Sequence, residues 1–132
     1  AKGLFAHSDG DVLIHAICDA LLGAAGLGDI GIQFPNTDLR YKNISSLKLL
    51  DAVNVKISHI GYKVNNIDSV LIADKPNLAP YRAQIIGKVS SILKIKPETV
   101  NIKATTSEGV GQIGSKALAS YAVALLRKNR KK

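Results

Sequence analysis

Segments with helical periodicity alternate with short strand-like segments along this chain, and glycine or proline residues separate them. In the helical segments apolar residues recur every three or four positions, which predicts helices with one buried face. The predicted helices run from about residue 11 to 26, from Ser45 or Ser46 to Gly61, and from Pro80 onward with a buried stripe of Ile85, Val89 and Ile92. This alternation indicates an α/β or α+β layer fold.

The ends of the predicted helices carry the usual capping residues. Ser8 or Asp9 stands where a side chain can cap the first helix, and Gly61 stands in the position favoured for a helix C-cap. Pro80 can occupy the first position of the third helix, where its missing N–H is not needed.

Two further segments are predicted strands, and a third is ambiguous. Residues 64–73 alternate loosely between apolar and polar, and residues 100–105 form a short strand-like run after Pro97. In residues 117–126, the spacing of Leu118, Tyr121, Ala122 and Leu125 favours a helix. The length and apolar density of that segment also allow a central strand, so both interpretations stay open.

Length and composition favour one domain over residues 1–132 and argue against two classes of partner. The net charge of +8 depends mostly on residues 127–132, because the remainder has 13 basic and 10 acidic residues. Such a terminal run is typical of a solvated, disordered tail, and aromatic residues make up only 5%, so we expect no nucleic-acid partner. No apolar run approaches the roughly 20 residues that cross a bilayer, so we expect no membrane partner.

The cysteine and methionine counts give two further expectations. Cys18 is the single cysteine, which excludes a disulfide framework within the chain. The chain contains no methionine and starts at Ala1, so we expect that it begins downstream of a natural start.

Asp11, His15 and Asp19 are spaced four residues apart in the first predicted helix and therefore share one face. A histidine between two carboxylates suits a divalent metal, with the carboxylates as further ligands or as acceptors that orient the ring. Ordinary ion pairs on a helix surface would give the same pattern, and spacing alone does not decide between the two.

Three other segments carry polar groups in arrangements that suit phosphate or polyol ligands. His7 and Ser8 precede the first predicted helix, whose N-terminus attracts anions, although a plain helix cap explains them equally simply. Asp29 lies in the glycine-rich turn GDIG, where it could accept hydrogen bonds from hydroxyl groups or only shape the turn. The run TTSEGVG follows a predicted strand and could cradle a phosphate, with Glu108 beside a phosphate-bound Mg²⁺.

Four strings taken in order resemble one enzyme family over essentially the whole chain. They are AHSDGDVLIHAICDALLGAAGLGDIG, FPNTD, IADKPNLAP and NIKATTSEGVG. They resemble the 2-C-methyl-D-erythritol 2,4-cyclodiphosphate synthases, which make a cyclic diphosphate intermediate of isoprenoid precursors. The resemblance implies an α+β fold with a mixed four-stranded sheet and helices on one face. It also implies a homotrimer whose sheets pack around the three-fold axis, with active sites between adjacent subunits, and it implies that residues 117–126 form a strand.

The resemblance also implies the reaction and its location. The 2-phosphate of 4-diphosphocytidyl-2-C-methyl-D-erythritol 2-phosphate attacks the β-phosphate and expels CMP, which makes the enzyme a phosphorus-oxygen lyase. The expected compartment is the bacterial cytoplasm, or a plastid in a eukaryote. A non-catalytic trimer that binds a cytidine nucleotide or phosphate on the same scaffold is the alternative.

Site residues follow from the resemblance position by position. His15 matches a zinc ligand, Glu108 matches the ligand of Mg²⁺ or Mn²⁺ at the diphosphate, and His7 and Thr106 match groups that stabilise the transition state. The implied substrate-binding residues are His7, Ser8, Asp29, Ile30, Gly31, Phe34, Pro35, Asn36, Thr37, Asp38, Ala73, Asp74, Lys75, Pro76, Asn77, Leu78, Ala79, Thr105, Thr106, Ser107, Glu108, Gln112 and Ser115. Within this set, residues 29–31 would hold the methylerythritol hydroxyls, 34–38 would form a flexible loop over the substrate, 73–79 would contact cytosine from a neighbouring subunit, and 105–108 would bind the diphosphate.

The sequence departs from the family pattern in three places. It contains no GxDxH motif, which in the family supplies two further zinc ligands from an N-terminal strand, and we expect that strand to lie outside the given chain. Gln112 and Ser115 stand where the family usually has Phe and Arg, so a ligand in the cavity on the trimer axis would be held differently. Lys75 precedes Pro76 and Asn77 follows it, whereas the family usually has a lysine after the proline, and this change could alter phosphate contacts.

Overall fold

The computed structural model describes residues 2–73, 79–106, 111 and 118–129, with the side chains of residues 2–9 and 79 left out. Its longer elements are α1 (Lys2–Ala24), α2 (Ile30–Gln33), α3 (Ser46–His59), β1 (Tyr62–Ile72), α4 (Arg82–Leu93), β2 (Val100–Thr105) and β3 (Ala119–Lys128). Short 3₁₀ turns lie at Leu39–Tyr41, Ala79–Tyr81 and Pro97–Thr99.

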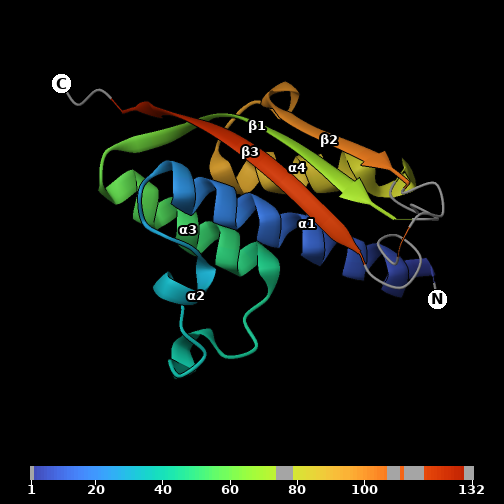
Figure 1. Ribbon diagram of the computed structural model, residues 1–132. Helices are drawn as coiled ribbons and strands as arrows, with labels where there is room; N and C mark the ends of the chain where they lie inside the picture. Colours follow the sequence, from blue (N-terminus) through green and yellow to red (C-terminus); the bar gives the residue numbers. More distant parts are fainter. Residues whose placement is uncertain (1, 74–78, 107–110, 112–117, 130–132) are drawn as a thin grey trace.

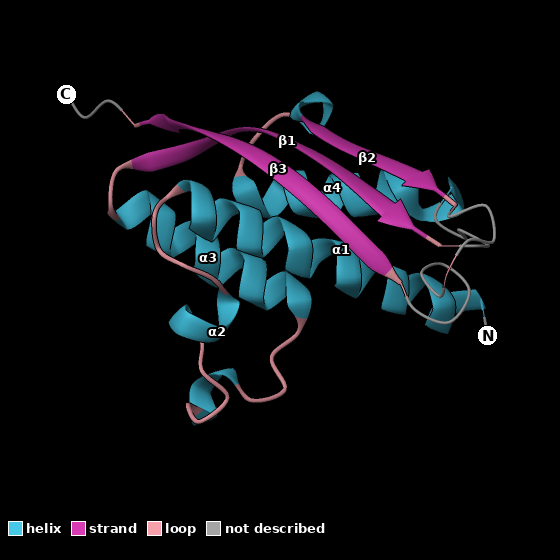
Figure 2. Ribbon diagram, viewed as in Figure 1, coloured by secondary structure: helices cyan, strands magenta, loops and turns pink. Residues whose placement is uncertain are grey.

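The described strands form one mixed sheet in the order β2-β1-β3. β1 pairs parallel with β2, from Ile67 opposite Val100 to Ile72 opposite Thr105. β1 pairs antiparallel with β3, from Tyr62 opposite Lys128 to Ile72 opposite Ala119. Figure 2 shows that α1, α3 and α4 lie on the same face of this sheet. The predicted α+β class is therefore confirmed, with a three-stranded mixed sheet in the part of the chain that is described.

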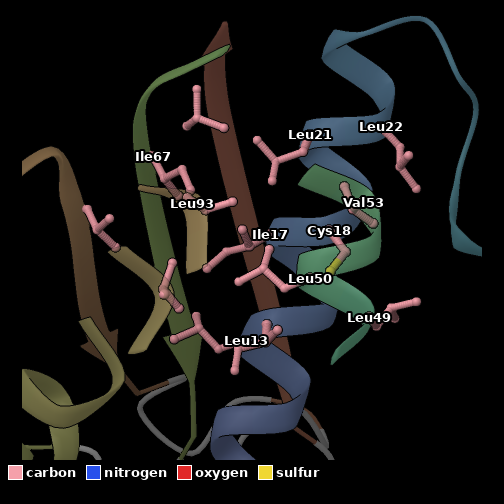
Figure 3. Close-up of a cluster of buried hydrophobic side chains, with 14 of the residues drawn as sticks. Leu13, Ile17, Cys18, Leu21, Leu22, Leu49, Leu50, Val53, Ile67 and Leu93 are labelled. Carbon is pink, nitrogen blue, oxygen red and sulfur yellow. The ribbon is translucent and has the colours of Figure 1, made fainter. Parts of the chain in front are cut away.

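The core lies between the sheet and the helices. Leu13, Ile17 and Leu21 of α1 are fully buried, and Leu50 of α3 and Ile67 of β1 are at most 1% exposed. Figure 3 shows the side chains of these two helices directed toward one another and toward the strands. Each such aliphatic side chain contributes about 1.5 to 3 kcal/mol when removed from water, so this cluster holds α1 firmly against α3 and the sheet.

The second predicted helix is confirmed, together with both of its ends. The Ser45 side chain accepts a hydrogen bond from the backbone N–H of Lys48 at 3.2 Å, and α3 begins at the next residue. Gly61 has φ +95° and directly follows the C-cap residue Ile60. Ser45 and Gly61 therefore terminate α3 by the capping chemistry that the sequence predicts.

The third predicted helix is confirmed, but its buried stripe differs in part from the prediction. Pro80 lies in a 3₁₀ turn, and α4 itself begins at Arg82. Val89 is buried, as predicted, whereas Ile85 and Ile92 are half-buried against the core and Leu93 is buried instead. The stripe is therefore rotated toward Val89 and Leu93, the side on which α4 meets the sheet.

The helical interpretation of residues 117–126 is wrong, because Ala119–Lys128 form strand β3. Exposure alternates along this strand, with Tyr121, Val123 and Leu125 more than half exposed and the residues between them directed toward the core. Pairing with β1 satisfies the backbone groups on one edge of the strand, and α1 covers its inner face, so tertiary contacts override the helical spacing. The strand implied by the family resemblance is confirmed.

Two predicted boundaries are also wrong. α1 begins at Lys2 rather than near residue 11, so Ser8 and Asp9 lie inside the helix and neither is its N-cap. No proline interrupts residues 2–10, and each of the two glycines there, Gly3 and Gly10, costs only about 1 kcal/mol, so the helix extends toward its N-terminus. Arg127 and Lys128, the first two residues of the predicted basic tail, belong to strand β3.

Candidate functional site

A pocket of about 640 Å³ opens on the helical side of the domain, between α1, the segment that leads into α3, and the start of α4. It is lined by Gly10, Asp11, Ile14, His15, Asn43, Ile44, Ser45, Ser46, Leu47, Tyr81, Gln84, Ile85 and Lys88. This volume is typical of small-molecule sites, and the lining combines apolar side chains with a few polar ones, as such sites usually do.

His15 lies in this pocket, and the neighbouring carboxylates have structural partners. Asp11 accepts a hydrogen bond from the buried Ser46 hydroxyl at 2.5 Å, which ties α1 to the start of α3. Asp19 accepts from the backbone N–H of Ile30 at 2.9 Å, which ties α1 to α2. His15 itself is exposed between them. The four-residue spacing therefore places three side chains on one face, as predicted, and two of them hold neighbouring elements.

The side chains near His15 can be compared with the ligands that a zinc ion needs. Within residues 2–73, 79–106, 111 and 118–129, no group of three or more His, Cys, Asp or Glu side chains could hold a metal. His15 is exposed and lines a pocket, so its imidazole fits the role of one ligand. Cys18 does not fit, because burial raises the pKa of its thiol to about 12 and keeps it protonated.

The turn that contains Asp29 has a well-defined local structure. Asp29 is the N-cap of α2, and its carboxylate accepts from the backbone N–H of Ile32 at 2.9 Å. Gly28 has φ +86°, and a Cβ there would lie 2.8 Å from Cδ1 of Ile32, so this turn requires glycine. The structural role of Asp29 is thus capping, while Ile30 and Gly31 form the first turn of the same helix.

Phe34, the first residue of the loop that the resemblance implies, has a buried side chain. Its side chain is 4% exposed and packs edge-to-face on Tyr41, with ring centroids 4.8 Å apart. The ammonium group of Lys56 lies 5.3 Å from the centre of the Phe34 ring. Burial of an aromatic ring is strongly favourable, so Phe34 anchors the segment that follows it.

Pro35, Asn36 and Thr37, the residues that follow Phe34, are exposed. The segment ends at Asp38, which forms an ion pair with Arg40 at 2.8 Å. The hydrogen bonds from the Arg40 side chain and backbone hold the pKa of the Asp38 carboxyl below its usual value. The exposed residues 35–37, held between the buried Phe34 and the ion pair of Asp38, are therefore accessible to a ligand.

The structure brings together two predicted site segments that are far apart in the sequence. The backbone N–H of Ala73 donates to the carbonyl of Thr105 at 3.0 Å, because the parallel strands β1 and β2 end side by side. Thr105 and Thr106 are exposed at this edge, whereas Ala73 is buried. The carboxyl ends of parallel strands are a common location for ligand sites.

The two sets of predicted residues lie at different ends of the molecule. Figure 1 shows the ends of β1 and β2 near the first turns of α1, whereas α2 and the segment after it lie far from that edge, below α3. Residues 29–38 and the strand ends at 73 and 105–106 therefore do not meet within one chain.

Several predicted residues cannot be assessed. Asp74, Lys75, Pro76, Asn77, Leu78, Ser107, Glu108, Gln112 and Ser115 lie outside the described residues. His7 and Ser8 lie on α1, and Ala79 lies in a 3₁₀ turn, but their side chains are outside the description as well.

Several pocket residues were missed by the sequence analysis. They are Asn43, Ser46, Tyr81, Gln84 and Lys88. The spacing of residues 81, 84 and 88 places them on one helical face, which was a usable signal, but only the tertiary structure sets that face opposite His15. Nothing in the spacing of Asp11 and Ser46, 35 residues apart, indicates that they meet.

No helix in the described part of the chain is both long and apolar enough to cross a membrane.

These features define an α+β domain with a small-molecule pocket and a polar strand edge, and comparisons with known proteins identify its family. The model of the YgbB family matches residues 1–127. A 2-C-methyl-D-erythritol 2,4-cyclodiphosphate synthase of Desulfatibacillum aliphaticivorans is 50% identical over 126 residues, which cover 95% of this chain and 81% of the relative. A synthase of the same name from Clostridium botulinum (strain Alaska E43) is 58% identical over 114 residues, covering 86% and 73%.

A solved structure agrees with these relatives. The CDP-bound form of a 2C-methyl-D-erythritol-2,4-cyclodiphosphate synthase matches with a TM-score of 0.78 and 33% identity, over 86% of this chain and 74% of that one. The chain belongs to the YgbB family, whose curated relatives here are named 2-C-methyl-D-erythritol 2,4-cyclodiphosphate synthases. These relatives support a catalytic function in isoprenoid biosynthesis and do not support the non-catalytic alternative.

Proposed function

We propose that this chain converts 4-diphosphocytidyl-2-C-methyl-D-erythritol 2-phosphate to 2-C-methyl-D-erythritol 2,4-cyclodiphosphate and CMP. An oxygen of the 2-phosphate forms a bond to the β-phosphorus. The bond from that phosphorus to the oxygen bridging the α-phosphate breaks, and CMP leaves with that oxygen. The activity is formally that of a phosphorus-oxygen lyase in the methylerythritol phosphate route, and the proposed location is the bacterial cytoplasm. The observation that carries the proposal is family membership over residues 1–127, with His15 exposed in a pocket of suitable size.

The main obstacle to this reaction is repulsion between an anionic phosphate and an anionic diphosphate, so the site must supply positive charge and hydrogen-bond donors. Thr106 is exposed beside the end of β2, where its hydroxyl could donate to a diphosphate. His7 and Ser8 are proposed to donate to the substrate phosphates from α1. The exposed segment 35–37, anchored by Phe34, would cover the substrate, and residues 29–31 would hold its hydroxyls.

Divalent metal ions are proposed to complete the site. His15 would hold Zn²⁺ as one ligand, and Glu108 would hold Mg²⁺ or Mn²⁺ at the diphosphate. When bound, these ions supply positive charge that neutralises phosphate oxygens. The exposed imidazole of His15 supports its role, and the described residues contain no group of three His, Cys, Asp or Glu side chains that would form the site by themselves.

We further propose a homotrimer with a fourth strand in each sheet. β3 lies at one edge of the described sheet, so its outer edge is open to another strand. Tyr121, Val123 and Leu125 are 62%, 73% and 58% exposed on the outer face of β3, which suits burial against another subunit. The separation of residues 29–38 from the strand ends is explained if each active site takes one set from each of two subunits.

The proposed cytidine contacts follow from the same assembly. Residues 73–79 would meet cytosine through the backbone from a neighbouring subunit, and Gln112 and Ser115 would face the trimer axis. These contacts with cytosine would be made by backbone groups. The unusual side chains at Lys75 and Asn77 would therefore leave the cytosine contacts intact. A substrate containing CDP is therefore the proposed partner, as the CDP-bound relative suggests.

The proposal is tested by CMP release from the purified substrate, measured with added Zn²⁺ and Mg²⁺. A longer chain that carries the GxDxH strand of the family should release CMP and contain zinc, and His15→Ala should lower its zinc content. His59→Ala is the matched control, because His59 lies at the end of α3 and does not line the pocket. Zinc content unchanged by His15→Ala would remove His15 from the metal site, and absence of CMP release would refute the proposed reaction.

A further inference from the structure

The start of α4 contributes one wall of the pocket, and this wall has no role in the function proposed so far. Gln84, Ile85 and Lys88 lie on one face of α4, and Tyr81 precedes the helix on the same side. All four line the pocket together with His15. A ligand in this pocket would therefore contact α4 as well as α1.

Lys88 supplies a positively charged side chain to this wall. It is exposed and forms no ion pair or side-chain hydrogen bond with another described residue. Asp11 is the carboxylate among the pocket residues, and its Oδ1 accepts the hydrogen bond from Ser46. The positive charge of Lys88 is thus not neutralised by a described partner, which favours an anionic ligand group near α4.

Apolar side chains make up part of the pocket lining, and this part is called the apolar floor below. Ile14 is 5% exposed, and Ile44, Leu47 and Ile85 are half-buried against the core. These apolar side chains can pack against the carbon skeleton of a ligand. Gln84 and Tyr81 add an amide and a phenol at the same wall as Lys88. This combination suits a small branched carbon skeleton that carries a phosphate and hydroxyl groups.

We propose that Lys88 binds the 2-phosphate of the substrate, with the methyl-branched carbon chain on the apolar floor of the pocket. This inference rests on the proposed function and adds a specificity residue to it. Lys88 holds the attacking phosphate by a charge-assisted hydrogen bond while the cytidine part of the substrate extends outside this pocket. Lys88 is a binding residue, so its loss acts mainly on affinity for the polyol phosphate.

The test compares Lys88→Met and Lys88→Arg with the matched control Lys48→Met. Lys48 is also exposed and lies in the first turn of α3, but it does not line the pocket. The binding of 2-C-methyl-D-erythritol 2-phosphate and of CDP is measured by calorimetry at low and high salt, with circular dichroism to verify folding. Lys88→Met should weaken binding of the polyol phosphate about tenfold, the typical effect of one charge-assisted hydrogen bond. CDP binding should stay unchanged, Lys88→Arg should restore most of the affinity, and high salt should reduce the difference.

The outcomes separate this inference from the proposed function. If the polyol phosphate does not bind, or if Lys88→Met behaves like Lys48→Met, the inference is overturned even where the wild-type chain releases CMP. An equal loss of CDP affinity also overturns it, because the effect is then not specific to the 2-phosphate. If binding of the polyol phosphate depends on Lys88 but CMP is never released, the pocket inference stands and the proposed reaction fails.

Discussion

The hydrogen bond between Ser46 and Asp11 gives a prediction whose size follows from the structure. Ser46 is 7% exposed, and its hydroxyl donates to the Asp11 carboxylate across 35 residues of sequence, at 2.5 Å. Hydrogen bonds to charged groups contribute about 1.5 to 3 kcal/mol. Asp11 is only half-buried, so water can replace part of the lost contact when the hydroxyl is removed. We therefore expect Ser46→Ala to lower the free energy of unfolding by about 1.5 kcal/mol, near the lower end of that range.

Urea denaturation at a fixed protein concentration measures this change, because the stability of an oligomer depends on concentration. With a slope of about 1.5 kcal/mol per molar urea, the midpoint should fall by about 1 M. Ser58→Ala is the control, since Ser58 is exposed on the same helix and should change the midpoint little.

A double-mutant cycle isolates the pair, which matters because Asp11 has contacts other than Ser46. Ser46→Ala, Asp11→Ala and the double variant should give a coupling free energy of about 1 to 2 kcal/mol. A coupling free energy near zero, or equal effects of Ser46→Ala and Ser58→Ala, would refute the reasoning.

Three further predictions concern the loop, the diphosphate site and the assembly. Arg40→Gln should raise the pKa of Asp38 toward its ordinary value, and NMR titration of the carboxyl group measures this pKa. Because the pKa of Asp38 is lowered in the folded state, the ionised carboxylate stabilises the fold slightly at neutral pH. This small stabilisation is lost as the pH falls through the folded-state pKa. If the pKa of Asp38 is unchanged in this variant, Arg40 is not the cause of the lowered pKa. Glu108→Gln should lower CMP release far more than CDP binding, and equal loss of both would argue against a metal role. Val123→Asp should dissociate the proposed trimer in sedimentation experiments, because it puts a charge on the outer face of the sheet. Val55→Asp, at an exposed position of α3, is the control and should leave the mass unchanged. An unchanged mass of the Val123→Asp variant would refute the proposed interface.

Local signals predicted those parts of the fold that depend on neighbouring residues. The cap at Ser45, the break at Gly61 and strand β2 at Val100–Thr105 all follow from chemistry within a few positions. The start of α1 could not be predicted in this way, because Ser8 is favoured at a helix N-cap by its local chemistry but lies inside the helix in the structure. Phe34 shows the same limit: the resemblance places it in a loop over the substrate, and only the tertiary structure shows that it is buried and packed against Tyr41.

The sequence by itself determined the family, because its motifs carry chemically specific residues in a fixed order, and it determined that His15 shares a helical face with Asp11 and Asp19. The tertiary structure decided what those residues touch. It made residues 119–128 a strand, since β1 and α1 supply backbone partners and a buried face that no local spacing can represent. It also brought Lys88 and His15 into the lining of one pocket, because their proximity depends on how α1, α3 and α4 pack.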